Sequence, residues 1–133
     1  MYDLENEELE THMNNSFNIP LFSRSIITPQ GEIYLTGGLL KPNYLQTTFF
    51  YEQSLNEFKR KSDMQVPRAD HSLVYMGGYI YAVGSFVHNK CNQSCERYDV
   101  QQNIWMSIAS LKFGRAGVAL CGFDNQFIYA FGG

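Results

Sequence analysis

A chain of 133 residues, 44% hydrophobic and 17% charged, is long enough for a core of its own and too apolar to be disordered throughout. The net charge of −3 hides an asymmetry, because the first ten residues carry five of the thirteen acids and no base. The rest has eight acids against ten bases and no Lys/Arg cluster beyond residues 59–61, which argues against nucleic-acid binding.

Targeting signals and cysteine content favour an intracellular, cytoplasmic protein. The N-terminus lacks the basic start and apolar run of a signal peptide. No stretch reaches the ~18 apolar residues that a membrane span requires. Three cysteines, an odd number, argue against a disulfide framework. We therefore expect a reducing compartment and no membrane association.

Residues 1–22 are predicted to be an acidic, flexible N-terminal arm, because no apolar stripe is present that could dock a helix over residues 3–13. The folded part is expected over residues 23–133. Its first unit, residues 24–67, has strand-like runs near 25–28, 32–37, 47–53 and 57–63. The first two are joined by a turn at 29–31, where Pro fixes φ and Gly tolerates positive φ. A loop is expected at 39–46.

The second unit, residues 68–114, has strand-like runs near 73–76, 79–83, 95–98 and 104–109. Gly77 and Gly78 predict a two-residue hairpin turn, and residues 99–103 a polar turn. A polar loop is expected between the second and third strands. Residues 115–133 hold two strands, near 117–121 and 126–132, joined by a turn at Asp124 and Asn125.

The units repeat with one period. Tyr81 stands 47 residues after Tyr34 and 48 residues before Tyr129. An aromatic pair seven residues apart, followed ten residues later by an arginine, also recurs at an offset of 47. These residues are Tyr51, Phe58 and Arg68, then Tyr98, Trp105 and Arg115. Four antiparallel strands in about 47 residues are typical of one propeller blade.

These residues resemble the kelch repeat, whose pattern is a Gly-Gly pair closing the second strand, a Tyr-Asp, a Trp, and an Arg opening the next repeat. The matching residues are Arg24, Gly37, Gly38, Tyr51, Phe58, Arg68, Gly84, Tyr98, Asp99, Trp105, Arg115, Gly132 and Gly133. The departures are Ser85 for a second glycine, Glu52 for Asp, and Phe58 for Trp. The resemblance implies an all-β fold, a partial kelch β-propeller of four-stranded antiparallel blades with a half blade at 115–133.

A propeller closes with about four to eight blades, and this sequence has two and a half. Blades without a neighbour expose apolar faces and unpaired edges. We expect the chain to be a fragment whose ring is completed by missing sequence. Completion by other chains, or an autonomous partial propeller, stays open as an alternative.

Residues with chemical potential have simpler structural explanations. His88, Cys91 and Cys95 are of zinc-ligand type, but a fourth ligand is missing nearby and Cys95 suits a buried strand position. His71 follows Arg68 by three residues, where a hydrogen-bonded structural role is expected. No catalytic triad can be identified. We expect no metal, no cofactor and no catalytic residue.

The loops after the second strands are the candidate binding sites, because kelch propellers commonly bind partners on this side. The candidates are Lys41, Asn43, Tyr44, Phe86, His88, Asn89 and Lys90. Merely capping the blade ends is the alternative. The resemblance implies a non-catalytic module that binds an unidentified protein. The Tyr-Asp and Trp pattern is most similar to BTB-kelch proteins, so the substrate-recognition part of a ubiquitin-ligase adaptor is one alternative. A remnant of a kelch-like sugar or copper oxidase is another, with three scattered histidines against it.

Overall fold

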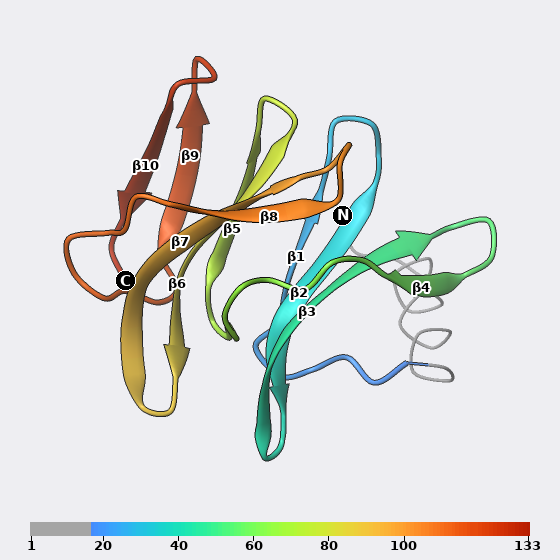
Figure 1. Cartoon of the computed structure of the whole chain (residues 1–133), viewed down its shortest axis with the longest axis horizontal. Helices are drawn as coiled ribbons and strands as arrows, with labels where there is room; N and C mark the ends of the chain where they lie inside the picture. The colour runs from blue at the N-terminus through green and yellow to red at the C-terminus, as the bar shows by residue number, and fades with distance from the viewer. Residues whose placement is uncertain (1–16) are drawn as a thin grey trace, which may run out of the picture.

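The computed structural model describes residues 17–133, and these residues form ten strands in three antiparallel sheets (Figure 1). The first blade comprises β1 (Arg24–Ile27), β2 (Ile33–Leu40), β3 (Asn43–Glu52) and β4 (Glu57–Arg60). The second blade comprises β5 (Ser72–Met76), β6 (Tyr79–Val87), β7 (Lys90–Asp99) and β8 (Ile104–Ile108). A separate pair contains β9 (Ala119–Phe123) and β10 (Phe127–Phe131). The predicted all-β fold of four-stranded blades is confirmed.

The three sheets stand side by side, with β1, β5 and β9 as neighbouring inner strands (Figure 1). Within residues 17–133, no helix is long and apolar enough to cross a membrane. Two predicted turns are confirmed by their backbone angles. Gly77 and Gly78 have φ of 60° and 89°, and Asp124 and Asn125 have φ of 56° and 51°, as two-residue hairpin turns of this kind require.

The core lies between the sheets. Tyr34 of β2 packs against Ile80, Tyr98 and Trp105 of the second blade, joined by Met64 from the segment between the blades. A second cluster joins the second blade to the β9–β10 pair through Val83, Cys95 and Val118. The outer face of the β9–β10 pair is apolar and open to solvent. Its exposed aromatic residues are Phe123, Phe127, Tyr129 and Phe131.

The predicted loops between the second and third strands are wrong, because both are continuous β-hairpins. β2 and β3 pair out to Leu40 and Asn43, and β6 and β7 pair out to Val87 and Lys90. The register of each hairpin shifts at a glycine, Gly37 or Gly84, where a bulge interrupts the pairing. Beyond the bulge the strands leave the core, so no apolar alternation marks them in the sequence.

The predicted equivalence of Arg24 with Arg68 and Arg115 is also wrong. Arg24 lies in β1 opposite Thr36, the position that Ser72 occupies opposite Val83 in β5. Arg68 and Arg115, in contrast, precede β5 and β9 by four residues. The cause is the β1–β2 turn, which has five residues between its last paired positions where the β5–β6 turn has two. The longer turn placed an unrelated arginine near the expected distance.

Residues 17–22, the described part of the predicted arm, lie against the first blade. The Phe17 ring centroid is 4.3 Å from that of Phe58 and 4.8 Å from that of Phe49. Leu21 exchanges two main-chain hydrogen bonds with Leu39 of β2, of 2.9 and 2.7 Å. The rest of the predicted arm, residues 1–16, lies outside the described residues, and its flexibility stays a prediction.

Candidate functional site

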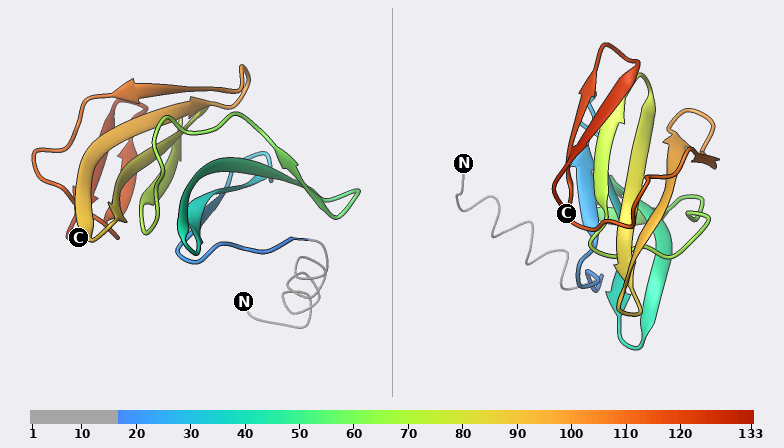
Figure 2. Two further views of the ribbon diagram at one scale, coloured as in Figure 1. Left: turned by 60° about the horizontal axis from the view of Figure 1, so that its bottom comes forward. Right: turned by 90° about the vertical axis from the view of Figure 1, so that its left-hand side faces the viewer.

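The ends of the β2–β3 and β6–β7 hairpins project from the same side of the molecule, at the bottom of Figure 1 and of the right view of Figure 2. They carry all seven candidate binding residues of the sequence. The two hairpins touch, because the rings of Tyr44 and His88 meet edge to face with their centroids 4.8 Å apart. We call these seven residues the hairpin surface: Lys41, Asn43, Tyr44, Phe86, His88, Asn89 and Lys90.

The hairpin surface is mostly open to solvent. Six of its residues are exposed, and Tyr44 is half-buried by its contact with His88. A hollow lies beside the second hairpin. It is lined by Val66 and Pro67 of the segment between the blades, and by Val87, His88 and residues 90–93 of the hairpin. This side of the molecule therefore offers relief and side chains of mixed polarity.

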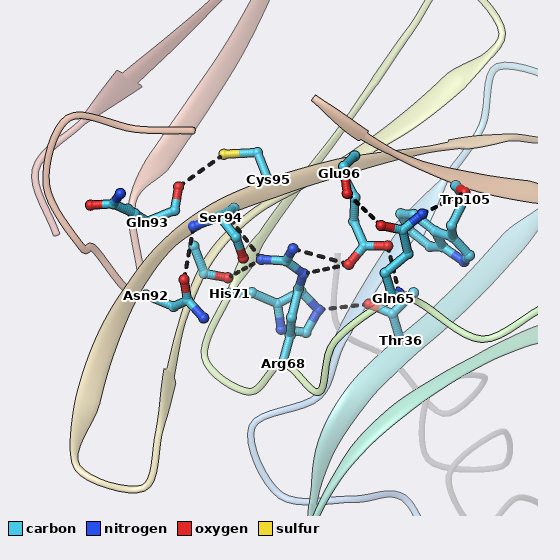
Figure 3. Close-up of polar contacts among 12 residues, drawn as sticks. Thr36, Gln65, Arg68, His71, Asn92, Gln93, Ser94, Cys95, Glu96 and Trp105 are labelled. Atoms are coloured by element: carbon cyan, nitrogen blue, oxygen red, sulfur yellow. Dashed lines mark hydrogen bonds and ion pairs between the residues drawn. The ribbon is translucent and has the colours of Figure 1, made fainter. Parts of the chain in front are cut away.

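A buried arginine fixes the base of both hairpins (Figure 3). Arg68 is 1% exposed, and its Nε and Nη2 donate to Glu96 Oε2 at 3.1 and 3.0 Å. Its Nη1 donates to the carbonyl oxygens of Gly84 and Ser94 at 3.0 and 2.8 Å. All these acceptors belong to β6 and β7, so one side chain holds the two strands that form the second hairpin.

The main chain of Arg68 binds the first hairpin. Its N–H donates to Leu45 O at 3.0 Å, and its carbonyl accepts from Gly38 N at 2.7 Å. Arg115 repeats this pattern one blade later: its N–H donates to Asn92 O at 3.1 Å and its carbonyl accepts from Ser85 N at 3.0 Å. Arg115 Nη1 donates to Gly132 O at 3.1 Å. These two arginines therefore connect successive blades beneath the hairpins.

Trp105 and Tyr98 make the second connection between the blades. Trp105 Nε1 donates to Thr48 Oγ1 at 2.9 Å and to Ser62 O at 3.1 Å, both of which precede the second blade in the chain. Tyr98 is fully buried, and its hydroxyl donates to Asn103 Oδ1 at 2.6 Å. The geometry gives these residues a packing and hydrogen-bonding environment.

His71 is completely buried between the blades. Its Nε2 lies 2.7 Å from Thr36 Oγ1 and shares a hydrogen bond with that hydroxyl. Burial lowers the pKa of His71 to about 3, and the nearby Arg68 and Arg24 add to this effect. The imidazole is therefore neutral near pH 7 and has no solvent access.

The zinc-like group of the sequence does not converge. His88 and Cys91 are exposed at the second hairpin, whereas Cys95 is buried beside Val83 and Val118. Burial raises the pKa of the Cys95 thiol. In residues 17–133, no three His, Cys, Asp or Glu side chains come together as a metal site would require.

Sequence reasoning missed two residues of this framework. Glu96 is the buried partner of Arg68, and Asn103 accepts from Tyr98 while its Oδ1 also accepts from Ser62 N at 3.0 Å. Asn56 stands 47 residues before Asn103 and contacts Tyr51 in the same way, so the repeat period could have found it. Glu96 has Phe49 at the corresponding position and left no periodic signal.

Comparison with known proteins identifies the repeat, because the model of the kelch motif matches residues 67–112. These residues are a kelch repeat. They span the arginine, the tyrosine and the tryptophan that join the two blades. The described sheets on either side extend the kelch blade architecture along the chain.

The chain is distantly homologous to Kelch-like proteins over part of its length. It is 33% identical to Kelch-like protein 15 of Danio rerio over 86 residues, which are 62% of this chain and 14% of that protein. It is 30% identical to Kelch-like protein 23 of Homo sapiens over 103 residues, 76% of this chain and 18% of that protein. Alpha-scruin of Limulus polyphemus is 33% identical over 110 residues, 76% of this chain and 12% of that protein. The matched part is thus less than a fifth of each of these relatives.

Proposed function

We propose that these kelch blades are a non-catalytic module that binds a protein partner through the hairpin surface. The observation that carries the proposal is the contact of Tyr44 with His88, which joins two projecting hairpins into one surface. Exposed aromatic and polar side chains on a rigid scaffold are the usual makeup of a protein-binding site. Phe86 is 41% exposed and supplies an apolar anchor next to the polar groups.

The framework below the surface supports this role. The buried Arg68–Glu96 pair and the main-chain bonds of Arg68 hold the bases of both hairpins, so little ordering is needed when a partner binds. The His71 imidazole is buried and neutral, which suits structure better than acid–base chemistry. Free thiols at Cys91, Cys95 and Cys121 are in keeping with an intracellular, cytoplasmic setting.

The test compares partner capture by three forms of the full chain. One is unchanged, and one has K41A, F86A, N89A and K90A in the hairpin surface. The matched control has Q30A, Q101A and Q102A, which are exposed at the other end of the blades. Proteins captured by the unchanged chain are quantified by mass spectrometry, and the strongest is then purified and titrated by calorimetry.

We expect the hairpin variant to bind the purified partner at least about tenfold more weakly, a loss of about 1.4 kcal/mol, because hot-spot truncations cost this much or more. The control variant is expected to bind like the unchanged chain. Equal binding by all three forms, with unchanged melting curves, would place the partner elsewhere and overturn the proposal.

A further inference from the structure

Charge is divided between the two ends of the blades. The turns at the end opposite the hairpin surface carry acids and no Lys or Arg across residues 28–32, 52–57, 76–79, 99–104 and 123–127. We call this end the turn surface. Its acids are Glu32, Glu52, Glu57, Asp99 and Asp124. A partner with many carboxylates is therefore repelled by this end of the molecule.

The hairpin end carries cations. Lys41 lies in the β2–β3 turn, Lys90 opens β7, and Lys112 and Arg115 lie in the segment between β8 and β9. None of these four forms an ion pair with a carboxylate of residues 17–133. The acids of the segment between β4 and β5 are already neutralised, since Asp63 pairs with Arg60 and Asp70 with Arg24.

The cations lie on three segments that touch in sequence around this end. Tyr44 and His88 join the first hairpin to the second. The segment between β8 and β9 packs so closely on the second hairpin that a Cβ on Gly114 would overlap the main chain of Cys91. Exposed phenylalanines stand among the charges, with Phe86 41% and Phe113 69% exposed.

We propose that the partner of this end is an acidic peptide segment that also carries apolar side chains. Lys41, Lys90, Lys112 and Arg115 bind its carboxylates, and Phe86 and Phe113 contact its apolar groups. This deepens the proposed function and rests on it. Complementary charge speeds association and excludes wrong partners, and screening by salt weakens it. The acidic turn surface adds to the selectivity, because it repels the same segment from the opposite end.

The test uses a phage library of random dodecapeptides as the probe, selected on the immobilised full chain in low salt. Enriched peptides are then measured by fluorescence anisotropy on three forms. These are the unchanged chain, a K41E/K90E/K112E variant of the hairpin end, and an E32K/E57K/D124K variant of the turn surface. All substituted side chains except Glu32 are exposed, and melting curves check that each variant folds.

We expect enriched peptides with net negative charge and an apolar residue, bound at least about tenfold more weakly by the hairpin-end variant and at least as well by the turn-surface variant. Their affinity should fall as salt rises from about 50 to 300 mM. Peptides that need the hairpin end but are neutral or basic would overturn this inference and leave the proposed function standing. Absence of enrichment, or binding indifferent to the hairpin-end variant, would count against both.

Discussion

Arg68 and Glu96 form an ion pair in which both side chains are 1% exposed, so neither charge can be solvated if its partner is lost. Glu96→Gln keeps the shape and removes the charge. We expect it to lower the free energy of unfolding by about 3–5 kcal/mol, because an unpaired buried charge remains. Asp63→Asn breaks the exposed pair with Arg60 and should cost at most about 1 kcal/mol. Urea denaturation measures both, and equal losses would contradict the assignment.

The buried imidazole of His71 makes a prediction about pH. Its pKa is about 3 in the folded chain and near 6.5 when unfolded, so between these values the unfolded state alone binds the proton. Stability should therefore be lost as pH falls from about 6.5 towards 3, by about 1.4 kcal/mol per unit from this group. In His71→Gln this part of the pH dependence disappears, as urea titrations from pH 7 to 4 would show.

The matched control is His88→Gln, because His88 is exposed at the second hairpin. It should keep the pH profile of the unchanged chain. A His71→Gln profile that runs parallel to the unchanged one would mean that His71 is protonated in the folded state too.

At the scale of the element, the β6–β7 hairpin depends on the bulge at Gly84. Gly84 has φ of 67°, and a Cβ there would overlap the carbonyl oxygen of Arg115. Gly84→Ala should therefore cost more than about 3 kcal/mol and loosen the hairpin surface, because both backbone strain and a main-chain clash oppose it. Gly78 has φ of 89° but open space around its Cβ position, so Gly78→Ala should cost about 1 kcal/mol.

Thermal melts compare the two stabilities, and hydrogen exchange of residues 85–92 reports on the hairpin itself. Faster exchange in the Gly84 variant alone is the expected result. Similar effects of both substitutions would mean that backbone angle, and not the contact with Arg115, limits this position.

The same element shows what the sequence could and could not predict. Tyr34, Tyr81 and Tyr98 fall in strands where the repeat period placed them, because they face the core and alternate with it. The outer halves of the hairpins were missed, since residues beyond the bulge pack against little and carry no alternation. The pairing of Arg68 with Glu96 was missed because it joins residues 28 apart in the chain and has no counterpart in the first blade.

At the scale of the whole molecule, the candidate surface combines residues of two blades, so its geometry depends on how the blades are held together. The sequence placed all seven candidates in two segments at corresponding positions of the repeat. It could not show that Tyr44 and His88 touch, because that contact depends on the angle between neighbouring blades. Arg68, His71 and Trp105 set this angle through their bonds to the first blade.

Trp105 reports on the union of the blades, because it is the single tryptophan of the sequence and is 5% exposed between them. We expect its fluorescence and the far-UV circular dichroism to change at the same urea concentration. Thr48→Val removes one acceptor of the indole N–H and should lower both midpoints together, by about 1 kcal/mol of stability. Thr47→Val, at the adjacent half-buried position, should change neither by as much. A fluorescence transition that precedes the dichroism would show that the blades separate before they unfold, and the hairpin surface would then exist only while they remain together.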